Sequence, residues 1–337
     1  MYWYYKYPVL VLLILVVFGL GYLVWTNLPD DVMPDLPIAG TEGGTGVTGD
    51  VAGTEDMSGD VDAGDEREDT GPLADRVLQS ESDSEVDTVK AELLQRIESA
   101  QKQLDNENLV AARTLAEKVL QDPALQRFSN TWIQAAEIIS RVNTVLVNSD
   151  APAPEKAAYI VKEGDSLAKI AADQNTTVGA LQRFNDLDPT NPIIYPGNVL
   201  YVIQGTWSVF VSKSRYRLLL MNDGRLFKMY PVGIGRQNRT PVGVFEVSSK
   251  VREPAWTPPG RHIPYGDPEN VLGTRWLGIR PIEGTDKALK GYGIHGTWQP
   301  ETVGTAASQG CIRMRNEDVN ELYDLVPKGT RVVIEDD

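Results

Sequence analysis

The sequence predicts a multidomain chain. It combines a single N-terminal transmembrane helix, a disordered acidic linker, a small α-helical segment, a compact β-α-α-β module and a mostly β C-terminal domain. Three observations predict this order. An uncharged apolar run occupies residues 8–25, acidic residues crowd residues 27–87, and the apolar period changes from helical to alternating near residue 205. The predicted boundaries are 1–26, 27–83, 84–148, 157–204 and 206–336.

The apolar run at residues 8–25 is long enough to cross a bilayer as a helix. Aromatic residues lie at both of its edges, among them Trp3 and Trp25, as at the two water–lipid boundaries. Lys6 and the α-amino group are the positive charges that precede the run, and Asp30 follows it. This bias predicts a single-pass protein of the cytoplasmic (inner) membrane with most of the chain on the extracytoplasmic side. A cleaved signal peptide is the alternative, but no small-x-small cleavage site follows the run.

The acidic linker carries almost all of the net charge. Residues 27–87 hold eighteen Asp or Glu against Arg67 and Arg76, a balance of −16, while the whole chain has −15. Such a composition does not bury enough apolar surface to order itself, and a coil of this length spans roughly 40 Å. We interpret it as a tether, with an acidic interaction tail as the alternative. Because no basic face accompanies it, nucleic acid is excluded as a partner.

Apolar residues recur at helical spacing between residues 84 and 148. Breaks at Asp105-Asn106 and Asp122-Pro123 divide this segment into about three helices, a small hairpin or bundle. Its apolar stripes are interpreted as core. A protein-binding groove is the alternative.

A short β-α-α-β module follows. A strand ends at Gly164, and Asp165 or Ser166 provides a helix cap. Thr177 begins a second helix, and Pro196-Gly197 turns the chain into a returning strand. The segment 159–203 closely resembles a LysM domain. That resemblance implies binding to N-acetylglucosamine-containing glycan of peptidoglycan, and a fold that acts only as a spacer is the alternative. The glycan-contacting positions it implies are Gly164, Asp165, Ser166, Leu167, Ile193 and Ile194.

The C-terminal domain reads as mostly strands. Apolar residues alternate over 207–211, a strand core covers 217–221, and Asn222-Asp223-Gly224 is a hairpin turn. Helical character is expected only at 286–289 and 317–325. The domain carries eighteen Lys or Arg against fifteen Asp or Glu, so a ligand rich in carboxylates would suit it.

Cys311 is the only cysteine of the chain and His295 is one of two histidines. A thiolate attacks well and an imidazole titrates near working pH, so the pair is a candidate nucleophile and base. Gly310 allows a sharp turn before the nucleophile, and the N–H groups of Gly310 and Cys311 are candidate oxyanion donors. Arg313 is a candidate grip for a carboxylate, with a structural ion pair as the alternative. The alternative for Cys311 is a structural role, because a single cysteine without such a motif is usually a small buried apolar residue.

Six stretches of the C-terminal domain form a recognisable series. They are Pro231-Val232-Gly233, Thr240-Pro241-Val242-Gly243-Val244-Phe245, Trp256-Thr257-Pro258-Pro259, Leu272-Gly273-Thr274-Arg275-Trp276-Leu277, His295-Gly296-Thr297 and Ser308-Gln309-Gly310-Cys311-Ile312-Arg313. With these motifs, residues 207–335 resemble the YkuD-type L,D-transpeptidases, which crosslink peptidoglycan stems through a cysteine. The resemblance implies a mostly β, sandwich-like domain that uses no cofactor, and many members carry a second His where this chain has Gln309. Two isolated His and one Cys do not make a ligand set, so no metal is expected.

The resemblance also implies a mechanism. His295 takes the Cys311 proton, the thiolate attacks the L-centre carbonyl of a donor stem, D-Ala leaves, and an amine of a neighbouring stem resolves the thioester. The Gly296 carbonyl would orient the His ring. An L,D-carboxypeptidase and a non-catalytic wall-binding scaffold are the alternatives. The catalytic positions are Cys311, His295, Gly296 and Gly310, and the substrate-binding positions are Arg313, Ser308, Gln309, Tyr292 and Trp256.

Overall fold

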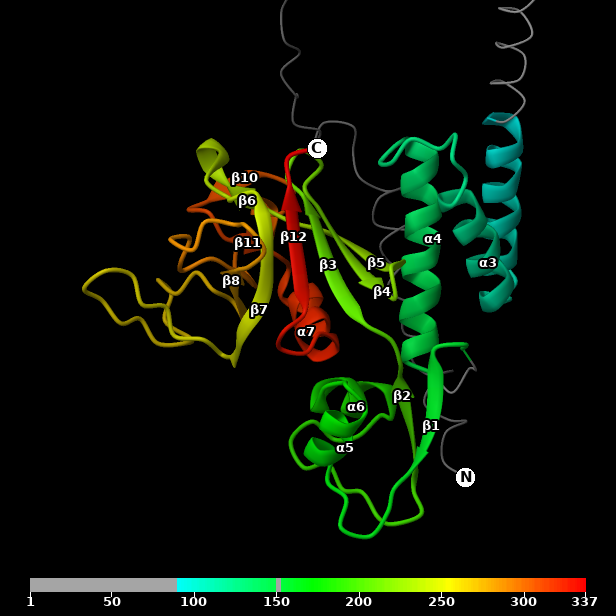
Figure 1. Ribbon diagram of the computed structural model, residues 1–337, viewed down its shortest axis with the longest axis horizontal. Coiled ribbons are helices and arrows are strands. Elements are labelled where there is room, and N and C mark those ends of the chain that lie inside the picture. Colours follow the sequence, from blue (N-terminus) through cyan, green and yellow to red (C-terminus); the bar gives the residue numbers. More distant parts are fainter. Residues whose placement is uncertain (1–89, 150–152) are drawn as a thin grey trace, which may run out of the picture. The chain divides into compact units, whose positions relative to one another are not determined.

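The computed structural model describes residues 90–149 and 153–337 (Figure 1). The predicted transmembrane segment and the acidic linker lie outside these residues, so both stay predictions. Among the residues that are described, no helix has both the length and the apolar character needed to span a bilayer.

The helical segment contains three helices, as predicted. A helix continues to residue 105 and is followed by α3 (Leu109–Leu120) and α4 (Asn130–Val147). Ser129 caps α4 by accepting a hydrogen bond from the Trp132 N–H at 3.3 Å, which satisfies one of the free amides of the first turn. The facing apolar stripes bury Ala112, Ala116 and Ile139 completely. The predicted core is therefore present.

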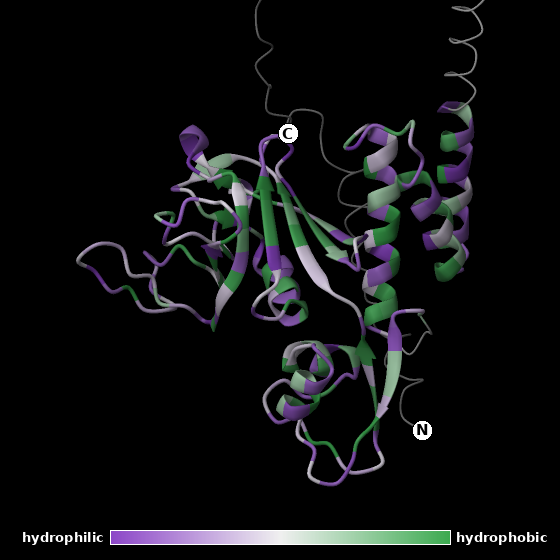
Figure 2. Ribbon diagram, viewed as in Figure 1, coloured by the Kyte–Doolittle hydropathy of each residue, from purple (hydrophilic) through white to green (hydrophobic). Residues whose placement is uncertain are grey.

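One side of α4 packs on the C-terminal domain. Asn143 Nδ2 donates to the Phe227 carbonyl at 2.7 Å, and the Met229 N–H donates to Ser140 Oγ at 2.9 Å. Trp132 and Leu219 share a small hydrophobic cluster across this junction. Figure 2 shows hydrophobic and hydrophilic bands alternating along α4, as expected of a helix covered on part of its surface. This face of the helical segment is therefore occupied by the chain's own sheet.

The β-α-α-β module forms as predicted, with β1 and β2 antiparallel. Ser166 caps α5 and Thr177 caps α6, each accepting a bond from the N–H three residues on. Apolar residues of both helices and of β2 make its core. The elements are β1 (Lys156–Ile160), α5 (Leu167–Asp173), α6 (Val178–Phe184) and β2 (Val199–Ile203).

The C-terminal domain is mostly β, as predicted. Hydrogen bonds join eight strands into one continuous sheet in the order β11-β9-β8-β7-β12-β3-β4-β5, and β10 pairs with β6 in a separate ribbon. Two pairs within the large sheet are parallel, β12 with β3 and β11 with β9. The strands are β3 (Trp207–Ser212), β4 (Arg217–Asn222), β5 (Arg225–Pro231), β6 (Ile234–Gly235), β7 (Gly243–Arg252), β8 (Arg275–Pro281), β9 (Gly293–His295), β10 (Ala306–Ser308), β11 (Ile312–Arg313) and β12 (Arg331–Glu335).

The predicted turns and helices of this domain had mixed outcomes. Asp223 and Gly224 have φ values of 47° and 74°, which fits the predicted two-residue hairpin turn. The helix expected at 317–325 is α7 (Asn316–Leu325). The helix expected at 286–289 is wrong, because these residues form only turns. Four residues close to Gly284 and Gly291 are too few to offset the cost of helix nucleation.

Candidate active site

The parallel pairing of β9 with β11 brings the segment of the candidate nucleophile next to the strand that carries the candidate base. Ile294 is opposite Ile312, and both side chains point into the core, with at most 1% of their surface exposed. Since side chains alternate along a strand, His295 and its partner Arg313 point to the other face. Cys311 immediately precedes β11, and the Gly293 N–H, two residues before His295 in β9, interacts with its thiol.

An indole forms the floor of this face. Trp276 pairs with His295 across β8 and β9, and the two rings stack with centroids 5.9 Å apart and planes at 24°. A Cβ atom on Gly293 would meet the Trp276 ring at 2.6 Å, and one on Gly278 would lie 2.9 Å from its Nε1. The two glycines therefore leave room for the indole beside His295.

His295 is almost completely buried, with 2% of its surface exposed. Its Nδ1 lies 2.6 Å from the Gly296 carbonyl oxygen, the contact that the sequence analysis expected. A carbonyl only accepts, so Nδ1 carries the proton and the neutral ring offers Nε2 as the base. Burial lowers the His295 pKa from 6.5 to about 4, the Arg313 charge lowers it further, and bonds to the Gly296 and Leu272 carbonyls partly oppose this. The imidazole is therefore neutral at pH 7.

The His-Gly-Thr loop is held by the start of α7. Asn316 Oδ1 accepts a hydrogen bond from the Thr274 N–H at 3.1 Å. The same oxygen blocks the space that a Cβ on Gly296 or Gly273 would need, and a Cβ on Gly296 would also lie 3.1 Å from the Thr274 nitrogen. Both glycines are required by this close approach. The packing fixes the Gly296 carbonyl and with it the ring of His295.

Cys311 is a partly exposed free thiol. Burial raises its pKa, while the Gly293 N–H and the Arg313 charge oppose that shift. Its Sγ lies 3.8 Å from the Gly291 carbonyl oxygen, a long thiol-to-carbonyl contact. The raised pKa favours the neutral thiol in the free site, so the thiol needs a base at the moment of attack.

One of the two predicted oxyanion donors, the Gly310 N–H, already forms a hydrogen bond within the turn that precedes Cys311. The Gly310 N–H donates to Ser308 Oγ at 3.0 Å, and that hydroxyl donates to the Cys311 carbonyl at 2.6 Å. Gly310 therefore contributes its φ of 140°, not its N–H, to the site. Ser308, 2% exposed, holds the turn instead of facing a substrate. The Cys311 N–H is left as the candidate donor of the pair.

Arg313 provides a cation on the same face. None of the ion pairs of residues 90–149 and 153–337 involves it, which argues against a purely structural salt bridge within that part of the chain. Its one side-chain hydrogen bond there is a long contact of 3.5 Å to Thr302 Oγ1. A guanidinium with no acidic partner beside a nucleophile suits a substrate carboxylate.

The remaining predicted substrate contacts are spread out. Tyr292 packs against Gly310, where an added Cβ would lie 2.8 Å from its ring. Gln309 is exposed beside the nucleophile. Trp256 is not brought to Cys311 by any hydrogen bond of the described residues, and its backbone pairs with Ile263 in the loop between β7 and β8. That loop is linked to the site by a different pair, Tyr265 and Trp298, whose rings are 6.0 Å apart.

The predicted glycan contacts of the module fall into two groups. The Asp165 carboxylate accepts bonds from the Tyr159 hydroxyl, the Lys162 N–H and the Lys169 ammonium, and Leu167 is 8% exposed in the core. These side chains serve the fold, and Ser166 is a helix cap. Ile193 is 56% exposed and free to touch a ligand, whereas Ile194 packs partly on the module core. Gly164 has a φ of 77° and open space around its Cα.

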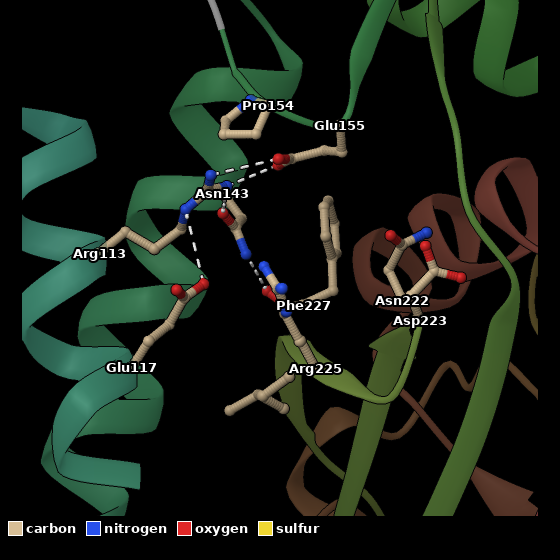
Figure 3. A pocket seen from close by; sticks show the side chains of 10 residues that line it. Arg113, Glu117, Asn143, Pro154, Glu155, Asn222, Asp223, Arg225 and Phe227 are labelled. Carbon is tan, nitrogen blue, oxygen red and sulfur yellow. Dashed lines mark hydrogen bonds and ion pairs between the residues drawn. The ribbon is translucent and has the colours of Figure 1, made fainter. Parts of the chain in front are cut away.

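Figure 3 shows the side chains that line a cavity between the helical segment and the C-terminal domain. The volume of this cavity is about 240 Å³. Arg113, 7% exposed, donates to Asn143 Oδ1 at 2.9 Å and to both Glu155 carboxylate oxygens. Two further cavities, of about 600 and 390 Å³, are also lined by the helical segment. Neither Cys311 nor His295 lines any of these three. The Arg113 side chain joins α3, α4 and the residue before β1.

Sequence reasoning missed two residues of the site. The sequence analysis names Trp276 only within a motif, and Asn316 is the residue directly before the helix expected at 317–325. Gly278 and Gly293 at strand positions were a signal for Trp276, because glycine inside a strand often marks a close approach. For Asn316 the sequence gives no such signal, since its contact with Gly296 depends on how α7 packs.

Comparisons with known proteins identify the families of two of these domains. Residues 206–334 match the sequence profile of the YkuD family, described as the L,D-transpeptidase catalytic domain. Residues 159–202 match the profile of the LysM domain.

Several named relatives are similar to this chain. YkuD of Bacillus subtilis strain 168, assigned by name to the L,D-transpeptidases, is 36% identical over 183 residues, which cover 52% of this chain and 97% of YkuD. YqjB of the same organism, with the same assignment, is 41% identical over 130 residues, which cover 38% of this chain and 71% of YqjB. The structure of L,D-transpeptidase 3 from Mycobacterium tuberculosis aligns at 19% identity over 43% of this chain and 77% of that one. Its TM-score of 0.32 is too low to carry weight.

Proposed function

The chain belongs to the L,D-transpeptidase family, and from this premise we propose that it crosslinks peptidoglycan stems by way of a thioester on Cys311. The observation that supports the proposal is the β9–β11 ladder, which puts His295 and Arg313 on one face and begins at the residue after Cys311. A neutral base, a thiol and an unpaired cation on one surface suit acyl transfer from a carboxylate-bearing peptide.

The first half-reaction forms the acyl-enzyme. His295 Nε2 takes the thiol proton as Sγ attacks the carbonyl carbon of the third, L-configured residue of a donor stem. The tetrahedral intermediate places its negative oxygen toward the Cys311 N–H. It collapses with cleavage of the C–N bond, and the imidazolium returns the proton to the departing amine of D-Ala. A thioester remains.

The second half-reaction forms the crosslink. An uncharged side-chain amine of a neighbouring stem attacks the thioester carbonyl and passes its proton to His295. The C–S bond breaks, the sulfur takes the proton back, and a new amide joins the two stems. Arg313 holds a donor carboxylate through both steps, because its charge has no acid to neutralise it in the described part of the chain.

Two further parts of the proposal concern location. The LysM module would hold glycan strands and so raise the local concentration of stems. The apolar run at residues 8–25 would anchor the chain in the cytoplasmic membrane with its catalytic domain outside, and the acidic linker would supply the reach to the wall.

The test uses the purified full-length chain in detergent micelles, because α4 packs on β5 and a shorter chain would expose that face. It is incubated with a disaccharide tetrapeptide and the products are analysed by mass spectrometry. Dimer together with free D-Ala supports transpeptidation. Tripeptide alone would mean that water resolves the thioester, and unchanged tetrapeptide would reduce the chain to a wall-binding scaffold.

Comparison of one variant with the wild type assigns the chemistry to the sulfur. Cys311→Ala is expected to abolish D-Ala release, and the intact mass of the wild type should rise by one acyl group that the variant lacks. D-Ala release by Cys311→Ala at the wild-type rate would contradict the role given to Cys311.

A further inference from the structure

We propose that Thr240 is a positioning residue that aims the Cys311 N–H at the developing oxyanion. Thr240 lies in the segment between β6 and β7, about seventy residues before the nucleophile, and it is 1% exposed. Its Oγ1 donates to the Gly310 carbonyl at 2.9 Å and accepts from the Gly235 N–H at 2.8 Å. The buried hydroxyl is therefore both a hydrogen-bond donor and a hydrogen-bond acceptor at the turn that precedes Cys311.

Because the peptide bond is planar, the contact at the Gly310 carbonyl also sets the direction of the Cys311 N–H. Gly310 O and the Cys311 N–H belong to one trans peptide unit and point in opposite directions. Holding the carbonyl toward Thr240 therefore directs the N–H away from Thr240. The Gly310 N–H is committed to Ser308 Oγ, so the Cys311 N–H is the amide of this pair that the hydroxyl controls.

The turn has few other restraints at this carbonyl. Gly310 has a φ of 140°, a conformation that glycine alone adopts readily, so its backbone is intrinsically free to rotate. A Cβ on Gly235 would lie 2.7 Å from the Gly310 Cα, so β6 is held directly against the turn. The hydroxyl connects these two backbones. Without it the same packing would persist, while the peptide unit of Gly310 and Cys311 would lose its fixed direction.

This inference rests on the proposed thioester chemistry, and it predicts which reactions of Cys311 depend on the hydroxyl. Acylation passes through a tetrahedral oxyanion, so it needs an aimed donor. Alkylation by iodoacetamide displaces iodide at a saturated carbon and forms no oxyanion. A residue that only stabilises the fold would affect both reactions alike.

The experiment compares the two reactions on the full-length chain. Acylation by 4-nitrophenyl acetate transfers the acetyl group to Sγ and releases nitrophenolate, which is followed by absorbance and by intact mass. Alkylation is followed by mass at the same pH. For Thr240→Val, which keeps the shape of the side chain and loses the hydroxyl, we expect acylation to fall roughly 10- to 100-fold. Alkylation should stay within about threefold, because no oxyanion forms in it.

Two further variants sharpen the result. Thr240→Ser keeps the hydroxyl and is expected to acylate within about threefold of the wild type. Thr330→Val is the matched control, since Thr330 is also buried and donates to a backbone carbonyl, that of Pro327, at 2.8 Å. It should leave both rates unchanged. If Thr240→Val does not fold, Thr240→Ala and Thr240→Ser differ by the hydroxyl alone and give the same comparison.

Three outcomes would overturn the inference: acylation of Thr240→Val at the wild-type rate, an equal loss of acylation and alkylation, or no acylation of wild-type Cys311 by the ester. Failure of the proposed function looks different. In that case the tetrapeptide releases no D-Ala, while acylation by the ester still depends on the Thr240 hydroxyl.

Discussion

The candidate active site and the LysM module use their motif residues in opposite ways. In the catalytic domain, the motif residues His295 and Arg313 end on one face of a strand ladder, and Arg313 has no acidic partner in the described part of the chain. In the module, the motif residue Asp165 is satisfied by three internal donors. The exposed Ile193 belongs to no strong motif. A dense motif therefore marks chemistry in one domain and folding in the other.

The space around two glycines, Gly296 in the catalytic domain and Gly164 in the module, differs in the same way between the two domains. Gly296 is enclosed by Asn316 and Thr274, so even a methyl group would displace the loop that orients His295. Gly164 has a φ of 77°, and no atom lies within 4 Å of the position that an added methyl group would take, so only its backbone conformation is special. The first is a constraint from packing around the site. The second is a constraint from a turn.

The largest effect should come from removing the base. His295→Gln keeps a hydrogen-bonding side chain but cannot take the thiol proton, and we expect the acylation rate with a tetrapeptide donor to fall about 10³-fold. Single-turnover D-Ala release measures it. His262→Gln is the matched control, because His262 is exposed and lies in the loop between β7 and β8. An equal loss in both variants would remove His295 from its role.

A smaller effect on activity is expected from filling the space at the enclosed glycine. Gly296→Ala should displace Asn316 and the His295 ring, lowering D-Ala release about 10²-fold, because small misplacements of catalytic groups have effects of that size. It should also destabilise the fold by about 1–3 kcal/mol through overpacking. Gly164→Ala should cost about 1–2 kcal/mol from its left-handed backbone and leave D-Ala release unchanged. Urea unfolding and single-turnover assays on both variants test the contrast.

The sequence predicted the elements of both domains better than it predicted their contacts. Caps at Ser166 and Thr177, the Asp223-Gly224 turn and the start of α7 were readable because each depends on a few neighbouring residues. The nucleophile and base were readable because Cys311 is unique.

Two of the misses depend on residues far apart in the chain. The reach of Asn316 to Gly296 and the packing of α4 on β5 arise only when the sheet has formed. The oxyanion role given to Gly310 failed for a local reason, because its N–H donates to Ser308 Oγ two residues earlier. A neighbouring hydroxyl competes for the N–H, and its direction is not written in the sequence.

Burial of the base should appear as a pH dependence of stability. The folded-state pKa of His295 is lowered from 6.5 to about 4, so between these values the unfolded chain binds a proton that the folded chain does not. The free energy of unfolding therefore keeps the contribution of the neutral His295 ring above about pH 6.5 and loses it as the pH falls toward 4. From pH 7 to pH 5 the loss should be about 2 kcal/mol.

The comparison of wild type with His295→Gln isolates this contribution. Burial raises the pKa of Asp318 to about 6, and this acts in the opposite direction, because the folded chain then binds the extra proton. Asp318 is present in both proteins, so its effect cancels in the difference. Urea unfolding at pH 7 and pH 5 should show a steeper loss in the wild type. Parallel losses would mean that His295 is not buried as a neutral ring.

The smallest effect is expected in the module, where it separates ligand contact from folding. Ile193→Ser removes an exposed apolar contact and should weaken binding to chitin oligosaccharides about three- to tenfold, with an unchanged melting temperature. Asp165→Asn removes a carboxylate whose pKa is held at about 2, first by the Lys162 N–H and then by Tyr159 and Lys169. It should lower the melting temperature and glycan binding together. Calorimetry measures the melting temperature of both variants, and glycan titration measures their affinity. Weaker binding by Asp165→Asn at an unchanged melting temperature would mean that Asp165 contacts the ligand directly.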